Sequence, residues 1–191
     1  GCSDWWDGSG DNGGGAQTER GTVSGKVVSS ATGEAIPGAS IRAGNATAIS
    51  EADGAYTLSP AVGERVVIQI EADGFAETVQ IARVTTGQTA SLDVSLLRIG
   101  WAEVLNVLSG GTVSIPNSSA QVNIPADGLV PVGGGTPSGN VNVSLTAINP
   151  AIDTGLMPGD FTAVLTGSGD AVPIESFGAL RVDVRDDNGE R

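Results

Sequence analysis

The sequence lacks histidine and has one cysteine, one lysine and few aromatic residues. Without histidine, no Ser-His-Asp or Cys-His catalytic arrangement can form within the chain, and a zinc site built on histidine is excluded. The single Cys2 cannot form an internal disulfide. Chemistry on this chain would have to use a carboxylate pair or a calcium site. No residue shows a catalytic pattern, so we expect no enzyme activity and no cofactor.

Long apolar runs and positive charge are also missing. No segment approaches the roughly 18 consecutive apolar residues that a membrane-spanning helix needs. The net charge of −13 opposes contact with phosphate backbones, so no nucleic-acid partner is expected. An acidic surplus of this size is typical of a soluble extracellular protein.

What the sequence does contain favours β-structure. Glycine occurs 29 times among 191 residues, and β-branched residues and turn formers dominate the remainder. We predict an all-β fold with two tandem small antiparallel β-sandwiches after a Gly-rich N-terminal tether. The expected parts are a tether over 1–20, a first sandwich over 21–98, a joint over 99–111 and a second sandwich over 112–191.

The first sandwich carries two turn signals. A Pro-Gly turn at Pro37 precedes a strand with Ala39 and Ile41 on one face, and Asp53-Gly54 leads into an alternating strand. An Asp-Gly pair between alternating runs is a strong hairpin signal, because glycine takes the positive φ that the turn requires. The alternation predicts a core formed by Val23, Val27, Ile36, Ile41, Tyr56, Leu58, Val67, Ile70, Phe75, Val79, Ile81, Leu92, Val94 and Leu96.

The same segment resembles a known family. The pattern runs from Val27 to Phe75 and combines I-P-G-A at Ile36 with D-G-x-Y at Asp53. It is similar to the carboxypeptidase regulatory-like domain, a transthyretin-like sandwich. The resemblance implies a non-catalytic accessory module of the kind found on secreted and surface proteins.

The N-terminus resembles the processed end of a bacterial lipoprotein. A small residue precedes Cys2, which would then be the lipidated first residue, and the following Ser3 fits passage to the outer membrane. Acyl chains would anchor the protein by burying methylenes at about 0.8 kcal/mol each. Alternatively, Cys2 is a free thiol or forms an intermolecular disulfide. The apolar rings of Trp5 and Trp6 predict contact with a neighbouring surface of the same chain or of another copy.

The joint and the second unit contain further signals. Trp101 begins a segment that can form a helical turn or a strand, and we expect its ring to pack between domains or between subunits. The motif I-P-A-D-G-L at Ile124, with the run from Met157 to Phe161 and a closing strand near Leu180, resembles a ZU5-like β-domain of bacterial surface proteins. That resemblance supplies no catalytic residue.

The end of the sequence predicts an open sheet edge. Asn188-Gly189 is a hairpin signal, but Glu190-Arg191 is too short to form a returning strand. We therefore expect the second sandwich to be incomplete at its C-terminus. A partner can complete such an edge by adding a strand.

Taken together, these patterns predict a structural lipoprotein of the bacterial outer membrane, exposed at the surface or extracellular. Its copies would form a homo-oligomer, or a polymer such as a fibre, tube or layer. The alternative is an accessory module that binds a glycan or a protein, with Trp101 as a contact. Calcium is the one metal to consider, since oxygen donors are available in loops at Asp153, Asp160 and Asp170.

Overall fold

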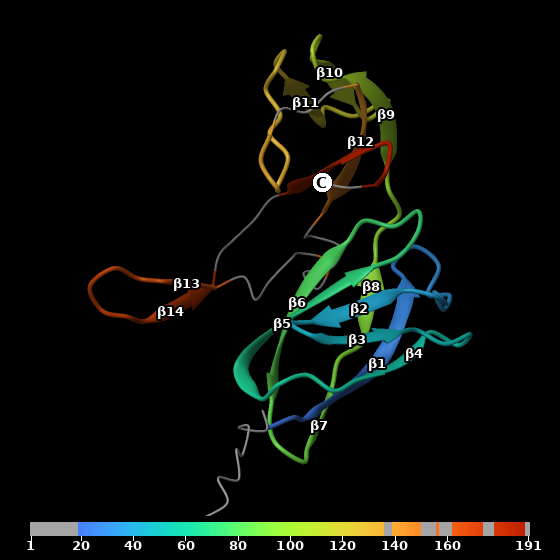
Figure 1. Cartoon of the computed structure of the whole chain (residues 1–191). Coiled ribbons are helices and arrows are strands. Elements are labelled where there is room, and N and C mark those ends of the chain that lie inside the picture. The colour runs from blue at the N-terminus through green and yellow to red at the C-terminus, as the bar shows by residue number, and fades with distance from the viewer. Residues whose placement is uncertain (1–18, 136–138, 150–155, 157–161, 174–177, 190–191) are drawn as a thin grey trace, which may run out of the picture.

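The computed structural model describes residues 19–135, 139–149, 156, 162–173 and 178–189. The described residues form strands β1 to β15 (Figure 1), which confirms the all-β prediction. Among them, no helix has the length and apolar character needed to cross a bilayer. Two groups of strands follow one another along the chain.

The first domain has two packed sheets (Figure 1). One has the order β4-β1-β7, with β8 also paired to β1, and the other has the order β3-β2-β5-β6. Its strands are β1 (Thr22–Ser29), β2 (Ser40–Ala43), β3 (Ala46–Ile49), β4 (Ala55–Leu58), β5 (Gly63–Glu71), β6 (Thr78–Val84), β7 (Thr89–Ser91) and β8 (Val94–Leu96).

The two packed sheets bury one continuous apolar cluster. Ile41, Ile68, Ile70 and Leu96 are fully buried in it, and Tyr56 is nearly so. The two turn signals lie where the sequence placed them: Gly38 and Gly54 both have positive φ, at 76° and 78°. The core prediction is therefore correct for most of its members.

Phe75 and Leu92 are only partly buried against this cluster, and three other predicted core residues do not belong to it. Val67 is 54% exposed, and Val79 and Ile81 are half-buried. Ile68 and Ile70 face the core, so Val67 must face outward in the period-two pattern of a strand. Its cross-strand partner Ile81 lies on the same outer face.

The first domain is not purely antiparallel. β1 pairs with β4 antiparallel, but with both β7 and β8 in parallel. Leu92 and Asp93 interrupt the parallel partner between its two halves. The predicted antiparallel sandwich therefore needs this correction.

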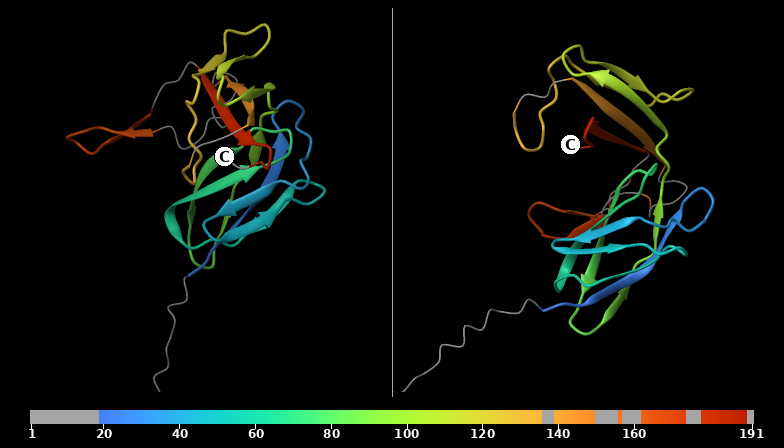
Figure 2. Two further views of the ribbon diagram at one scale, coloured as in Figure 1. Left: turned by 45° about the horizontal axis from the view of Figure 1, so that its top comes forward. Right: turned by 45° about the vertical axis from the view of Figure 1, so that its right-hand side comes forward.

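The second domain layers a three-stranded antiparallel sheet, β15-β12-β9, against a two-stranded β10-β11 hairpin. Val141, Val143 and Leu145 alternate along β12 and fill the space between the layers. Figure 2 shows this domain stacked on one end of the first. Its strands are β9 (Trp101–Asn106), β10 (Gly111–Ser114), β11 (Gln121–Ile124), β12 (Asn140–Ile148) and β15 (Ala179–Asp186).

The segment expected as a joint, residues 99–111, belongs largely to the second domain. β9 pairs with β12 from Leu145↔Trp101 to Asn140↔Asn106, and β10 already begins at Gly111. The alternatives left open for Trp101 are thus decided in favour of a strand. Only Leu97 to Gly100 connects the last strand of the first domain to the first strand of the second.

One more hairpin stands apart from both domains. β13 (Thr162–Val164) and β14 (Ala171–Pro173) pair only with each other among the described strands. Figure 1 and the left view of Figure 2 show the hairpin projecting from the body of the molecule.

Candidate functional site: the junction between the domains

The residues of the D-G-x-Y motif hold the first domain together. Asp53 accepts a hydrogen bond from the Ala55 backbone N–H at 3.0 Å and pairs with Lys26 at 3.2 Å. Together these bonds lower the pKa of the Asp53 carboxyl, the backbone bond being the larger cause. Gly54 accepts the Val27 N–H through its carbonyl at 2.9 Å. These contacts are internal to the first domain, so the motif stabilises its own turn and the adjoining strands.

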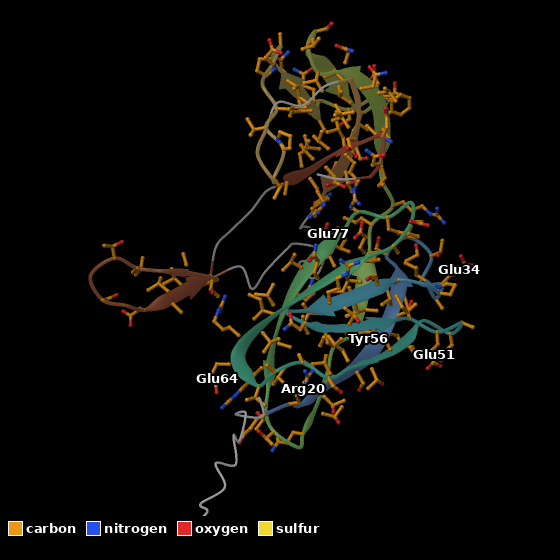
Figure 3. All side chains as sticks on the ribbon, viewed as in Figure 1. Arg20, Glu34, Glu51, Tyr56, Glu64 and Glu77 are labelled. Atoms are coloured by element: carbon orange, nitrogen blue, oxygen red, sulfur yellow. The ribbon has the colours of Figure 1, made fainter. Side chains whose placement is uncertain are left out.

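Tyr56 also stabilises the first domain, at the point where the parallel pairing of β1 is interrupted. Its buried phenol donates to the Leu92 carbonyl at 2.7 Å, and the Lys26 N–H donates to the Asp93 carboxylate at 2.8 Å. Burial, with the nearby negative charge of Asp93, raises the pKa of Tyr56 to about 12. Figure 3 shows Tyr56 within the first domain.

The raised pKa of Tyr56 predicts alkaline destabilisation. Because the folded pKa lies above the ordinary value of 10.0, this contribution to stability is intact below pH 10 and is lost as pH rises towards 12. At 1.36 kcal/mol per pH unit the loss is about 2–3 kcal/mol. Tyr56 is the only tyrosine, so phenolate absorbance in the folded protein reports its titration alone.

Tyr56→Phe supplies the control for this prediction. It should cost about 1 kcal/mol at neutral pH through the lost hydrogen bond, yet flatten the alkaline part of the stability curve. The variant keeps every other titratable group, so only the difference between the two stability curves counts. A phenolate signal that rises near pH 10 in the folded protein would contradict the assignment.

The most elaborate polar arrangement lies between the domains. One face of the second sheet carries Asn142, Ser144, Arg181, Asp183 and Arg185 at alternating positions of β12 and β15. This polar face meets residues 71–77 of the first domain, the end of β5 and the β5–β6 connection, across a cleft of ≈ 230 Å³. Figure 3 shows Glu77 at the end of the first domain that faces the second.

The first interdomain ion pair is nearly buried. Glu77, with a side chain only 5% exposed, pairs with Arg181 at 3.1 Å. Gln69 Nε2 donates to the same carboxylate at 2.6 Å. The Nε–H of Arg181 is buried without a hydrogen-bond partner among the described residues. Removing Arg181 alone would therefore leave a desolvated carboxylate at Glu77 without this cation.

The second interdomain pair lies beside the first. Arg185 bonds Asp183 on its own strand at 2.8 Å and Glu71 of the first domain through another nitrogen. The pKa of Arg185 is raised, mainly by the hydrogen bond to Asp183. Two arginines of β15 therefore form ion pairs with two glutamates of the first domain.

The charged side chains of the junction pair with one another. Its arginines are used in internal pairs, and no group of three or more metal-ligating side chains occurs among the described residues. The sequence did not single out Glu77 or Arg181. A signal was nonetheless present, since charges at every second position of a strand, as in Arg181, Asp183 and Arg185, indicate a polar sheet face that something must cover.

The predicted site residues fall elsewhere or outside the described part. Trp101 is 41% exposed on the edge strand β9. Asp170 is exposed in the turn of the β13–β14 hairpin. The lipidation site Cys2, the contact residues Trp5 and Trp6, and the calcium candidates Asp153 and Asp160 lie outside the described residues.

The two packed sheets and the residues of the two motifs define the first domain as a small β-sandwich module. Residues 22–97 match the family described as the carboxypeptidase regulatory-like domain. The chain therefore contains one such domain, and this confirms the resemblance carried by the I-P-G-A and D-G-x-Y motifs. The ZU5-like resemblance of the second unit stays a prediction.

Comparison with solved structures gives a distant similarity. The Bacillus anthracis TIE protein aligns over 87% of this chain at 15% identity, with a TM-score of 0.36. The chain spans 26% of that protein's length. No curated protein sequence matches the chain.

Proposed function

We propose that the protein is a non-catalytic structural module displayed at the bacterial cell surface and anchored to the outer membrane through lipidated Cys2. The observation that carries the structural part is the interdomain junction, where Glu77–Arg181 and Glu71–Arg185 tie two sandwiches together. A stiff pair of domains can hold an interaction surface at a fixed distance from a membrane. The proposed function also includes association between copies of the chain, and it requires no cofactor and no nucleic acid.

Three features support this function together. The regulatory-like domain is a type of module without catalysis. The groups with shifted pKa values, Asp53, Tyr56 and Arg185, all have structural hydrogen-bond partners. The acidic net charge of −13 suits an exposed protein that must stay soluble.

The anchoring is tested by Cys2→Ser in the full chain, expressed behind a bacterial lipoprotein signal. The unchanged protein should incorporate labelled fatty acid, fractionate with the outer membrane and be digested by protease added to intact cells. Cys2→Ser should lose the label and appear in the soluble fraction, since no acyl chain would hold it. Ser3→Ala is the matched control and should behave as the unchanged protein. An unlabelled protein, or Cys2→Ser that still fractionates with the membrane, would refute the anchor.

A further inference from the structure

A second hollow adjoins the interdomain cleft. It is a groove of ≈ 500 Å³ on the first domain, and residues 71–73 and Phe75 border both hollows. Pro37 and Gly38, the turn of the I-P-G-A motif, also line it. Sites for small organic ligands usually measure about 300–1,000 Å³, so the groove has room for one such molecule. Figure 3 shows Glu34, another lining residue, at the edge of the first domain.

The groove holds charges of both signs that have no ionic partner. Glu34 and Asp73 are exposed carboxylates, and neither pairs with a cation among the described residues. The guanidinium of Arg98 lies over the ring of Phe75, 4.9 Å from the ring centroid. Unlike the two arginines of the junction, Arg98 pairs with no carboxylate in the described part of the chain. These three groups are therefore available to a ligand.

Below the charged groups lies a hydroxyl that also lacks a partner. Ser29 lines the groove and is only 4% exposed, and its Oγ makes no hydrogen bond within the described residues. A buried hydroxyl without a partner is unfavourable in the folded state. A polar ligand atom that entered the groove would supply that partner. Ala35, Pro37 and Phe75 add apolar surface to the same groove.

The unpaired charges select the kind of ligand. An anion would meet two carboxylates on a chain of net charge −13, and a simple cation would meet Arg98. A ligand that carries both an ammonium and a carboxylate satisfies both signs. Its ammonium pairs with Asp73 or Glu34, and its carboxylate accepts the paired N–H bonds of the Arg98 guanidinium.

We infer that this groove binds a short peptide with both ends free. Its volume equals that of a cube about 8 Å on a side, and an extended dipeptide spans about 7 Å. Apolar side chains of the peptide would cover the ring of Phe75 and the neighbouring Pro37. This binding goes beyond the proposed function, and its failure would leave the Cys2 anchor and the interdomain pairs untouched.

Nuclear magnetic resonance titration of the full chain with the dipeptide alanyl-leucine tests the site. A ligand of this size should bind with a Kd in the high micromolar to millimolar range, and shift the amide signals of residues 34–38 and 72–75. N-acetylation or C-terminal amidation of the dipeptide should each weaken binding about fivefold or more, since each removes one charge. Absence of these shifts at millimolar peptide overturns the inference. So does a blocked dipeptide that binds as tightly as the free one.

Two charge variants test which end of the peptide each residue binds. Arg98→Gln should weaken the free dipeptide about tenfold, but should hardly change binding of the amidated one. Asp73→Asn should weaken the free dipeptide, but should hardly change binding of the N-acetylated one. Arg83→Gln and Asp127→Asn are the matched controls, because Arg83 is exposed on β6 and Asp127 is exposed and, like Asp73, precedes a glycine. Equal losses for free and blocked dipeptides, or in variants and controls, would refute the assignment.

Ser29→Ala separates binding from stability. Because its hydroxyl has no internal hydrogen bond to lose, the variant should melt at or above the temperature of the unchanged protein. It should nonetheless bind alanyl-leucine about threefold more weakly or worse, since the ligand loses one hydrogen bond. A variant that melts lower and binds the dipeptide as the unchanged protein does would show that the hydroxyl serves the fold, and would contradict its place in the site.

Discussion

Gly25→Ala is expected to destabilise the first domain by about 3–5 kcal/mol. A Cβ added at Gly25 would lie 1.9 Å from the carbonyl oxygen of Leu92 and 2.5 Å from its carbonyl carbon. Both atoms belong to the backbone, so no side-chain rotation relieves the clash. The domain must separate β1 from its parallel partner or unfold.

The close approach has a structural cause. β1 pairs with β7 at Thr22–Ser24 and with β8 at Val27–Ser29, and Gly25 lies between the two ladders. There the Leu92 N–H donates to the Ser24 carbonyl at 2.9 Å, while the Leu92 carbonyl accepts from Tyr56. A side chain at Gly25 would displace the Leu92 carbonyl and break that bond.

Calorimetry of the full chain measures the effect. We expect the melting temperature of the first domain to fall by more than about 12 °C. Gly133→Ala is the control, because a Cβ there meets nothing within 4 Å, and it should change stability by less than about 0.5 kcal/mol. A Gly25→Ala protein that melts like the control would mean that β1 and Leu92 are not in close contact.

Local signals in the sequence predicted much of the first domain. The turns at Gly38 and Gly54 depend on residues that take positive φ, and the alternation around Tyr56 and Leu58 fixes which side faces the core. Because Val66–Ile68 is a continuous apolar run, the sequence does not show which of these side chains face the core. Whether Val67 or Ile68 faces inward is decided by the neighbouring strands, and β5 also has a register irregularity between Gly63 and Val66.

Pairing between residues that are far apart in the chain could not be predicted from the sequence. The parallel ladders of β1 with β7 and β8 join residues more than 60 positions apart, and no turn signal specifies them. The interdomain junction is of the same kind, since Glu77 and Arg181 pair although they lie 104 positions apart and in different domains. Single residues such as Trp101 and Asp170 were selected by residue type. The junction depends instead on which sheet face the alternate charges of β15 occupy.

Arg181→Met is expected to destabilise the protein by about 2–4 kcal/mol, because it leaves the carboxylate of Glu77 buried without its cation. Three observations set the size. The Glu77 side chain is only 5% exposed, which favours a large effect. Gln69 continues to donate to it, and the substitution also removes the unsatisfied Nε–H of Arg181, which both reduce the effect.

The double variant Glu77→Met/Arg181→Met distinguishes the contribution of the ion pair from the cost of leaving one charge unpaired. Replacing both charges by apolar side chains of similar size should restore most of the lost stability, since a buried pair that is removed whole leaves no uncompensated charge. Urea unfolding of both single variants and the double variant then gives their coupling energy. Arg83→Met is the control: its pair with Glu64 has side chains 70% and 76% exposed, so its loss should change stability by at most about 1 kcal/mol.

The same variants test whether the junction stiffens the molecule. Small-angle scattering should show a wider range of domain separations in Arg181→Met than in the unchanged protein or in Arg83→Met, because one of the two interdomain pairs is gone. The double variant should stay stable yet be nearly as variable in shape as Arg181→Met, since methionines do not impose the direction that an ion pair does. If Arg181→Met changes neither stability nor shape, the junction does not hold the domains, and the structural part of the proposed function fails with it.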